Sequence, residues 1–190
     1  MLIDDSIIEG CVAGKRSAQS ALYRKFSSVM LAVCLRYAQN RNEAEDILQE
    51  AFLKIFQNIS SYRKEGSFEG WMKRIMINHA LNYYRKNRKQ PFLEDIESIN
   101  ETEIMEKDEQ PSTHAPVSAE KLTSLIQMLP PGYRMVFNMY VFEEYSHKEI
   151  SQELSISENT SKTQLLKARR MLRKKIIEMN LLKNTLMINE

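Results

Sequence analysis

The chain has 190 residues, of which 43% are hydrophobic and 27% charged, so it can form one domain or two small ones. Five glycines and five prolines are few for this length, and this scarcity favours an all-α fold. The two cysteines match no metal-ligand spacing and suggest no disulfide framework, which fits a reducing compartment. The chain also lacks the pattern of a signal peptide and any apolar run long enough to span a membrane. We therefore expect a cytoplasmic protein without membrane insertion.

The first part of the chain predicts three helices. Apolar residues recur at helical spacing over residues 17–39, and a wide apolar stripe predicts a second helix over residues 43–59. A loop then leads to a third predicted helix, over residues 68–87. We expect residues 1–92 to form one small helical domain. The polar side of its second helix carries Asp46, Gln49 and Glu50.

The composition changes at Pro91. Residues 93–116 contain eight acidic side chains and only one basic side chain, Lys107, and they show no periodicity. Prolines and self-repelling charge predict a flexible acidic linker, although an ordinary solvated loop explains the pattern equally well. Helical spacing resumes at Val117, so residues 117–190 are predicted to form a second small helical domain.

Residues 146–175 have the pattern of a helix-turn-helix, in which a first helix braces a second helix that enters the DNA major groove. Ile150 and Leu154 would face the core, and Ser157 would cap the second helix. The outward side then carries amides, hydroxyls and cations, which can pair with base edges and phosphates. Two amphipathic helices that simply pack, with a solvated cationic face, are the alternative. The candidate duplex contacts are Asn159, Thr160, Lys162, Thr163, Gln164, Lys167 and Arg170.

Residues 71–90 contain six basic side chains and no acid, interleaved with Trp71, Tyr83 and Tyr84. Cations beside aromatic faces and amides suit single-stranded nucleic acid, in which base faces and base edges are exposed. Alternatively, Trp71 belongs to the core and the charges are only solvated. The chain has three scattered histidines and lacks both a glycine-rich phosphate loop and a nucleophile motif, which argues against an enzyme, so we expect no catalytic residue, metal or cofactor.

Five segments of the chain, in order, resemble the extracytoplasmic-function (ECF, group 4) sigma factors of the sigma-70 family. They cover nearly the whole chain, from about Ile7 to Lys175. The resemblance implies an all-α protein with a region 2-like domain and a region 4-like helix-turn-helix domain joined by an acidic linker. The segments are "ALYRKF", "AEDILQEAFLKIF", "SFEGWMKRIMIN" with "NYYRK", "LPPGYRMVF" and "SHKEISQELSISENTSKTQLLKARRMLRK".

The resemblance also implies partners: core RNA polymerase, promoter DNA and an anti-sigma factor. Within the polymerase, Asp46, Gln49 and Glu50 would contact the clamp coiled coil of the β′ subunit, and the β subunit is a further expected partner. The basic aromatic helix would melt and capture the −10 element, and the helix-turn-helix would read the −35 element as duplex. The candidate single-strand contacts are Tyr62, Trp71, Asn78, Asn82, Tyr84, Arg85, Lys86 and Arg88.

The sequence departs from the family pattern at several positions. Asn82 stands where the family often has Asp, so an amide replaces any ion pair with Arg85. Ser155 stands where Gly is usual in the turn, and Ser161 stands where Val is usual. A buried hydroxyl needs a partner, and we expect Ser161 to bond back to a carbonyl of its own helix. The apolar pattern of residues 176–190 is compatible with an extension of the last helix or with packing on a partner.

Two other functions fit parts of the sequence. The first is a conventional helix-turn-helix regulator whose N-terminal domain senses a signal or dimerises, although the basic aromatic helix argues against it. The second is a regulatory protein that imitates a sigma factor and sequesters its inhibitor. Transcription with core polymerase distinguishes both from a sigma factor.

Overall fold

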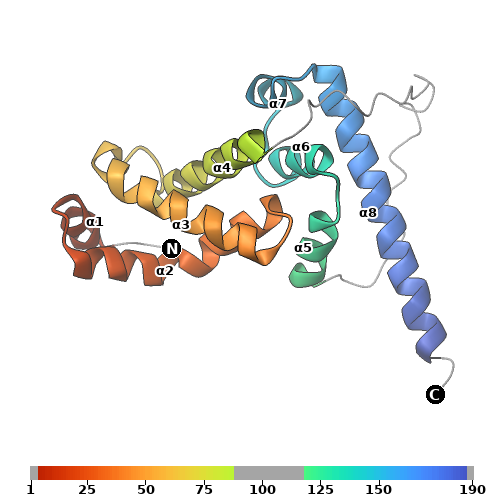
Figure 1. Cartoon of the computed structure of the whole chain (residues 1–190), viewed down its shortest axis with the longest axis horizontal. Coiled ribbons are helices and arrows are strands. Elements are labelled where there is room, and N and C mark those ends of the chain that lie inside the picture. The colour runs from red at the N-terminus through yellow and green to blue at the C-terminus, as the bar shows by residue number, and fades with distance from the viewer. Residues whose placement is uncertain (1–3, 88–117, 188–190) are drawn as a thin grey trace. The chain divides into compact units, whose positions relative to one another are not determined.

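The computed structural model describes residues 4–87 and 118–187 (Figure 1). No strand occurs within these two ranges, so the expected all-α class is confirmed. The chain divides into two compact units, residues Met1–Arg88 and Lys89–Glu190. The predicted acidic linker, residues 93–116, lies outside the described residues. The helices are α1 (Asp5–Val12), α2 (Arg16–Tyr37), α3 (Arg41–Asn58), η1 (Ile59–Ser61), α4 (Phe68–Asn87), α5 (Ala119–Gln127), α6 (Pro131–Val141), α7 (His147–Leu154) and α8 (Glu158–Met187).

The core of the first unit lies among α2, α3 and α4, each of which packs against the other two. Asn40 begins α3, because its side chain accepts a hydrogen bond from the backbone N–H of Glu43 at 2.9 Å. Burial of these apolar faces holds α3 and α4 in fixed register, which positions the polar side chains between them. The largest fully buried side chains of this unit are Leu22, Phe26, Met30, Ile47, Phe52, Ile55, Met72, Met76 and Leu81.

The short helix α1 is an element that the sequence analysis missed. Asp4 caps it by accepting a hydrogen bond from the N–H of Ser6 at 3.0 Å. It packs on α2 at Gly10, where a Cβ atom would lie only 2.7 Å from the Cβ of Ala18. Glycine is required for this close approach, since any larger residue would push the two helices apart.

The second unit is built around α6, which packs against α7 and α8, and α7 also packs on α8. Arg134 of α6 is only 1% exposed. Its guanidinium donates a hydrogen bond from Nη1 to the carbonyl oxygen of Gln127, the last residue of α5, at 2.8 Å. This bond satisfies a carbonyl at the end of α5 and attaches that helix to α6.

The helix-turn-helix forms as predicted, from α7, a tight turn and α8. Ser146 and Glu149 form a reciprocal capping box at the start of α7. Ser155 adopts the left-handed conformation, with φ 54° and ψ 49°. Ser157 then begins α8, because its Oγ accepts a hydrogen bond from the N–H of Thr160 at 2.9 Å. The chain beyond Lys175 extends α8 as far as Met187, whereas residues 188–190 lie outside the described residues.

Candidate functional site

The first candidate site is a groove of about 270 Å³ between α3 and α4 in the first unit. It brings together three predicted single-strand contacts, Trp71, Asn78 and Asn82, along one side of α4. The opposite side includes Lys54 and Asn58 of α3, which the sequence analysis missed. Their spacing of four residues places them on one helical face, and this signal could have identified them.

The amides of the groove differ in their bonding. Asn82 accepts a hydrogen bond at its Oδ1 from Nη1 of Arg85 at 2.9 Å, so the predicted replacement of an ion pair by an amide contact is confirmed. Asn78 is exposed, and its side chain makes no hydrogen bond within the described ranges. A groove lined by an unpaired amide, a second amide and an aromatic ring can contact both the edge and the face of a base.

The predicted DNA contacts at the C-terminal end of α4 differ in solvent exposure. Tyr84 is half-buried, whereas Arg85 and Lys86 are exposed. Arg88 lies outside the described residues. These two exposed cations lie about one turn beyond Asn82 along the same helix, where they can neutralise phosphates of a strand that enters the groove.

An aromatic cluster closes the other end of α4. Trp71 is half-buried and stacks on Phe68, with ring centroids 5.4 Å apart and an interplanar angle of 30°. The Tyr62 ring lies 5.6 Å from Trp71 and 5.0 Å from Phe68. The predicted strand contacts Tyr62 and Trp71 are therefore neighbours, and both rings contribute to packing as well as to the surface.

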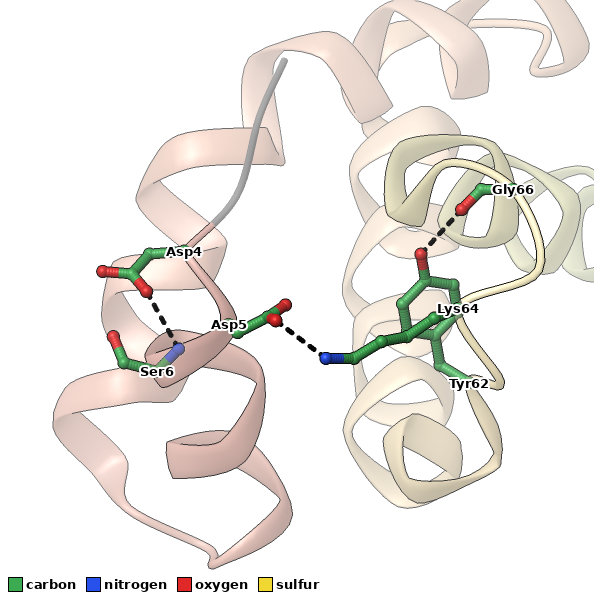
Figure 2. Close-up of polar contacts among 6 residues, drawn as sticks. All are labelled: Asp4, Asp5, Ser6, Tyr62, Lys64 and Gly66. Carbon is green, nitrogen blue, oxygen red and sulfur yellow. Dashed lines mark hydrogen bonds and ion pairs between the residues drawn. The ribbon is translucent and has the colours of Figure 1, made fainter.

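The loop between η1 and α4 is held by two polar contacts, shown in Figure 2. The Tyr62 hydroxyl donates a hydrogen bond to the carbonyl oxygen of Gly66 at 2.8 Å, which closes the loop on itself. Lys64, in the left-handed conformation with φ 60°, forms an ion pair with Asp5 of α1 at 2.7 Å. Because both side chains are mainly exposed, the ion pair adds little to the stability of the fold, and its main effect is to restrict the position of the loop.

The second candidate site is the exposed polar face of α3. Asp46, Gln49 and Glu50 are all exposed, as predicted for a docking face. Oε2 of Glu50 lies 2.9 Å from Nε2 of His79, which belongs to α4 and is only 7% exposed. Burial is the main cause that lowers the pKa of His79 below its usual range, with Lys54 acting in the same direction and Glu50 opposing them. The neutral imidazole then donates its Nε2–H to the Glu50 carboxylate and fixes that side chain.

A shallow depression of about 400 Å³ adjoins this face, between α2 and α3. Gln49 lines it together with Tyr23, Ser27 and Leu31. On the same helix Leu53 is 62% exposed, although it is apolar. The docking face therefore combines acidic and amide groups with exposed apolar surface, which is typical of a protein–protein interface.

The third candidate site is the outward face of α8 in the second unit. Asn159 and Lys162 are exposed, and Thr160 and Thr163 are half-buried. Lys167 is half-buried, with Nζ 6.0 Å from the centroid of the Tyr133 ring. The exposed cations of this helix are Lys162, Arg169, Arg170, Arg173, Lys174 and Lys175.

Two expectations for α8 were wrong. Gln164 was placed on the outward face, but its side chain is only 8% exposed because it lies at the margin of the packed stripe formed by Leu165 and Ala168. Ser161 was expected to bond back to a carbonyl of its own helix. Its hydroxyl, which is fully buried, instead lies 2.9 Å from Nδ1 of His147 on α7.

The described residues contain no group that could hold a metal ion and no helix that could span a membrane. No group of three or more His, Cys, Asp or Glu side chains within residues 4–87 and 118–187 could hold a metal ion. None of the helices in these ranges is both long enough and apolar enough to cross a membrane.

Comparison with known proteins identifies the family. The model of sigma-70 region 2 matches residues 22–90, and the model of sigma-70 region 4 matches residues 119–172, which together span more than half of the chain. The chain belongs to the sigma-70 family. The groove and the exposed polar face of α3 lie in region 2 of this sigma factor, and the helix-turn-helix lies in its region 4.

Individual relatives narrow the family to the ECF group. The sigma factor is 30% identical over 171 residues to the ECF RNA polymerase sigma factor SigW of Bacillus subtilis, with 86% of this chain and 91% of that protein covered. It is 25% identical over 182 residues to the ECF RNA polymerase sigma-E factor of Haemophilus influenzae, with 92% and 96% covered. The expected function of an RNA polymerase sigma factor is thereby confirmed, and the stand-alone regulator is not favoured.

A solved structure is also similar to the chain. It is the sigma factor RpoE in complex with the anti-sigma factor NepR from Bartonella quintana, with 14% identity, a TM-score of 0.48, and 84% of this chain and 96% of that chain covered. This score is too low to carry an argument about partners.

Proposed function

We propose that this sigma factor divides promoter recognition between its two units. Region 2 captures the −10 element as a single strand in the groove between α3 and α4, and region 4 reads the −35 element as duplex with α8. The observation that supports this division best is the groove itself, where Asn78, Asn82 and Trp71 line one concave surface. A duplex does not enter such a groove, whereas a single extruded base does.

The chemistry of the groove fits base capture. Extruding a base costs a few kcal/mol of unstacking, which must be offset by new stacking and edge contacts. The half-buried rings of Tyr62 and Trp71 offer faces, and the unpaired amide of Asn78 offers both a donor and an acceptor. Arg85 and Lys86 supply the sequence-independent attraction for the phosphates.

The helix-turn-helix is suited to duplex instead. Its outward face is convex and carries Asn159 and Thr163 near the start of α8, with cations toward the middle of the helix. In this geometry the short polar side chains reach base edges in the major groove and the cations reach phosphates. The acidic segment 93–116 would join the two units and keep them from collapsing onto the same DNA.

Docking on core polymerase is assigned to the exposed polar face of α3. Asp46, Gln49 and Glu50 would contact the clamp coiled coil of the β′ subunit, and Leu53 would supply an apolar contact beside them. The bond from His79 holds Glu50 in place before docking, which lowers the entropy that docking must overcome. Region 4 would contact the β subunit.

We further propose that an anti-sigma factor covers this same face. The exposed Leu53 and the depression beside Gln49 offer apolar surface and a concave contact area, which an inhibitor could occupy in place of the polymerase. Competition between core polymerase and the inhibitor for labelled sigma factor would test the proposal. Simultaneous binding of both partners would contradict it.

Transcription with reconstituted holoenzyme tests the function as a whole. Purified sigma factor and the host's core polymerase should together give specific run-off transcripts from a library of genomic fragments, and mapped start sites should share two upstream elements. Core polymerase alone is the control. Start sites without a common pair of elements, despite active core, would contradict the division of recognition between the two units.

A charge reversal tests the docking face. Asp46→Arg replaces an exposed acidic side chain at the proposed interface, and we expect it to weaken core binding by about 3 kcal/mol, more than a hundredfold. The matched control is Glu9→Arg, which makes the same charge change at an exposed position of α1 and should leave the affinity for core polymerase unchanged. Equal affinities of the two variants for core polymerase would exclude Asp46 from the interface.

A further inference from the structure

The helix-turn-helix contains a polar contact in its buried interior. Ser161, in the first turn of α8, has no exposed surface, and its Oγ lies 2.9 Å from Nδ1 of His147. His147 is the first residue of α7, so the contact joins the start of the brace helix to the start of the recognition helix. A buried hydroxyl without a partner would destabilise the fold, and the histidine supplies that partner.

The same histidine also contacts α6. Its ring stacks on Tyr140, with centroids 4.7 Å apart and an interplanar angle of 25°. The Tyr140 ring in turn lies 5.8 Å from the guanidinium carbon of Arg169, about two turns further along α8. A closed path of contacts therefore leads from Ser161 through His147 and Tyr140 to Arg169, and it fixes α8 at two points of its length.

Fixing Ser161 also fixes the rotation of the first turn of α8. Successive residues of a helix are separated by about 100°. When Ser161 points inward, Asn159 and Thr163, two residues away on either side, point about 200° around the helix and so toward the outside. A hydroxyl bond to a fixed ring restricts this rotation more than an apolar contact does, because a hydrogen bond is directional and apolar packing is not.

Burial and the nearby cations both favour the neutral form of His147. Burial is the main cause that lowers the pKa of His147, Lys162 and Arg169 of α8 act in the same direction, and Glu158 opposes them. From α6 the facing titratable group is Tyr140. The N-terminal position of His147 in α7 also disfavours a cation, because the helix dipole is positive there.

We propose that His147 is a positioning residue for promoter recognition: through Ser161 and Tyr140 it sets the rotation of α8 that presents Asn159 and Thr163 to the −35 duplex. The proposal rests on the proposed function, in which α8 reads duplex DNA. His147 itself touches no base. Its effect is therefore on the discrimination between sequences and not on the attraction to phosphates.

The test uses holoenzyme and two DNA probes. The first probe is a duplex selected from genomic fragments by wild-type holoenzyme, and the second is the same duplex with its mapped upstream element scrambled. The ratio of the two affinities measures discrimination, and the slope of affinity against salt measures the phosphate contacts. Thermal unfolding of each variant is recorded separately, since a merely structural role would lower the unfolding temperature and leave the ratio of the folded protein unchanged.

Ser161→Ala and His147→Leu each remove the bond. We expect the affinity ratio to fall about five- to tenfold in both variants while the salt slope is retained. His147→Asn places an amide nitrogen near the position of Nδ1, and we expect it to restore most of the ratio. Ser151→Ala is the matched control, because this serine of α7 bonds only locally, to the carbonyl of Lys148 at 2.7 Å.

The outcomes separate the two proposals. If wild-type holoenzyme fails to discriminate between the probes, the assignment of duplex reading to α8 is wrong. If the wild type discriminates and Ser161→Ala and His147→Leu keep its ratio, His147 has no positioning role although α8 reads the duplex. If Ser151→Ala lowers the affinity ratio as much as Ser161→Ala does, the proposal is also overturned. Such a result would show that any substitution in α7 or at its contacts reduces discrimination between the two duplexes.

Discussion

Residues 71–90 of region 2 and residues 158–175 of region 4 carry the same net charge, but the candidate site of region 2 is a groove and that of region 4 is one helix face. Residues 71–90 contain six basic and no acidic side chains, and residues 158–175 contain seven basic and one acidic. In region 2, Asn78 and Asn82 of α4 line a groove, whereas in region 4 Ser161 on the inner side of α8 lies against His147. In the proposed division of promoter recognition, charge would attract nucleic acid to both surfaces, and shape would decide which form of DNA each accepts.

The two regions also distribute their polar groups differently. In region 2, Asn78 faces solvent without a partner in the described part of the chain, ready for a ligand. In region 4, Ser161 and His147 lie inward and satisfy each other, which leaves the outward side chains to meet DNA. Region 2 thus leaves the amide of Asn78 open in its groove, although Asn82 is bonded to Arg85, whereas region 4 uses a buried polar pair to fix the orientation of its helix.

The strongest test of this contrast is Asn78→Ala. The variant removes an unpaired amide from the groove, so we expect it to weaken binding of holoenzyme to a single strand with the mapped −10 sequence by about 2 kcal/mol. Binding to a −35 duplex should be unchanged. Asn42→Ala, an exposed amide of α3 that does not line the groove, is the control. Equal losses on single strand and duplex would remove the distinction between the two surfaces.

The next largest effect is expected from Ser155→Gly. Ser155 holds φ at 54°, a conformation that costs a non-glycine residue roughly 1 kcal/mol or more, so glycine should stabilise region 4 by about 1 kcal/mol. Trp71 is the only tryptophan of the chain and belongs to region 2. Urea unfolding followed by circular dichroism should therefore shift to higher urea, whereas the transition seen by Trp71 fluorescence should not. A shift of both signals would show that the two units unfold together.

A smaller effect is expected from Lys174→Ala, which removes one exposed cation from α8. Affinity for the selected promoter and for its scrambled form should fall by the same few-fold factor, and the salt slope should decrease by about one. Lys148→Ala, an exposed lysine of the brace helix, provides the comparison for a cation outside α8. A loss confined to the selected promoter would mean that Lys174 contacts a base.

The smallest effect concerns pH and region 2. Because the pKa of His79 is lowered in the folded chain, the histidine contributes stability above its unfolded pKa of about 6.5, and this contribution is lost as pH falls through the folded value. His147 titrates in the same direction but lies in region 4, which Trp71 fluorescence does not report. The urea midpoint from Trp71 should thus fall between pH 7.5 and 5.5 in the wild type and fall less in His79→Gln. Identical pH dependence of the two proteins would contradict this role of His79.

Much of the fold could be predicted from helical spacing, since α2, α3, α4 and the helix-turn-helix each bury a continuous apolar face. The short α1 escaped prediction because eight residues give barely two turns of pattern, and its decisive feature is the fit of Gly10 against Ala18. Such a fit involves two helices and leaves no signal in either one alone.

The candidate sites were predicted less completely. The amide contact between Asn82 and Arg85 follows from spacing within one helix, and so it could be anticipated. The bond between Ser161 and His147 joins residues from two helices, and Gln164 is buried because neighbouring helices cover the margin of the stripe. A helical wheel divides a helix into two faces, whereas packing against several partners decides how far the buried face extends.

Because Gly10 has no side chain, α1 and α2 approach each other very closely where Gly10 faces Ala18. The same helix α1 positions Asp5, which forms an ion pair with Lys64 in the loop before α4 (Figure 2). A single methyl group added at residue 10 would push α1 away from α2 and so shift Asp5 relative to that loop. The distance between α1 and α2 thus determines whether Asp5 can pair with Lys64, so close packing at the start of the chain affects the position of a loop more than fifty residues away.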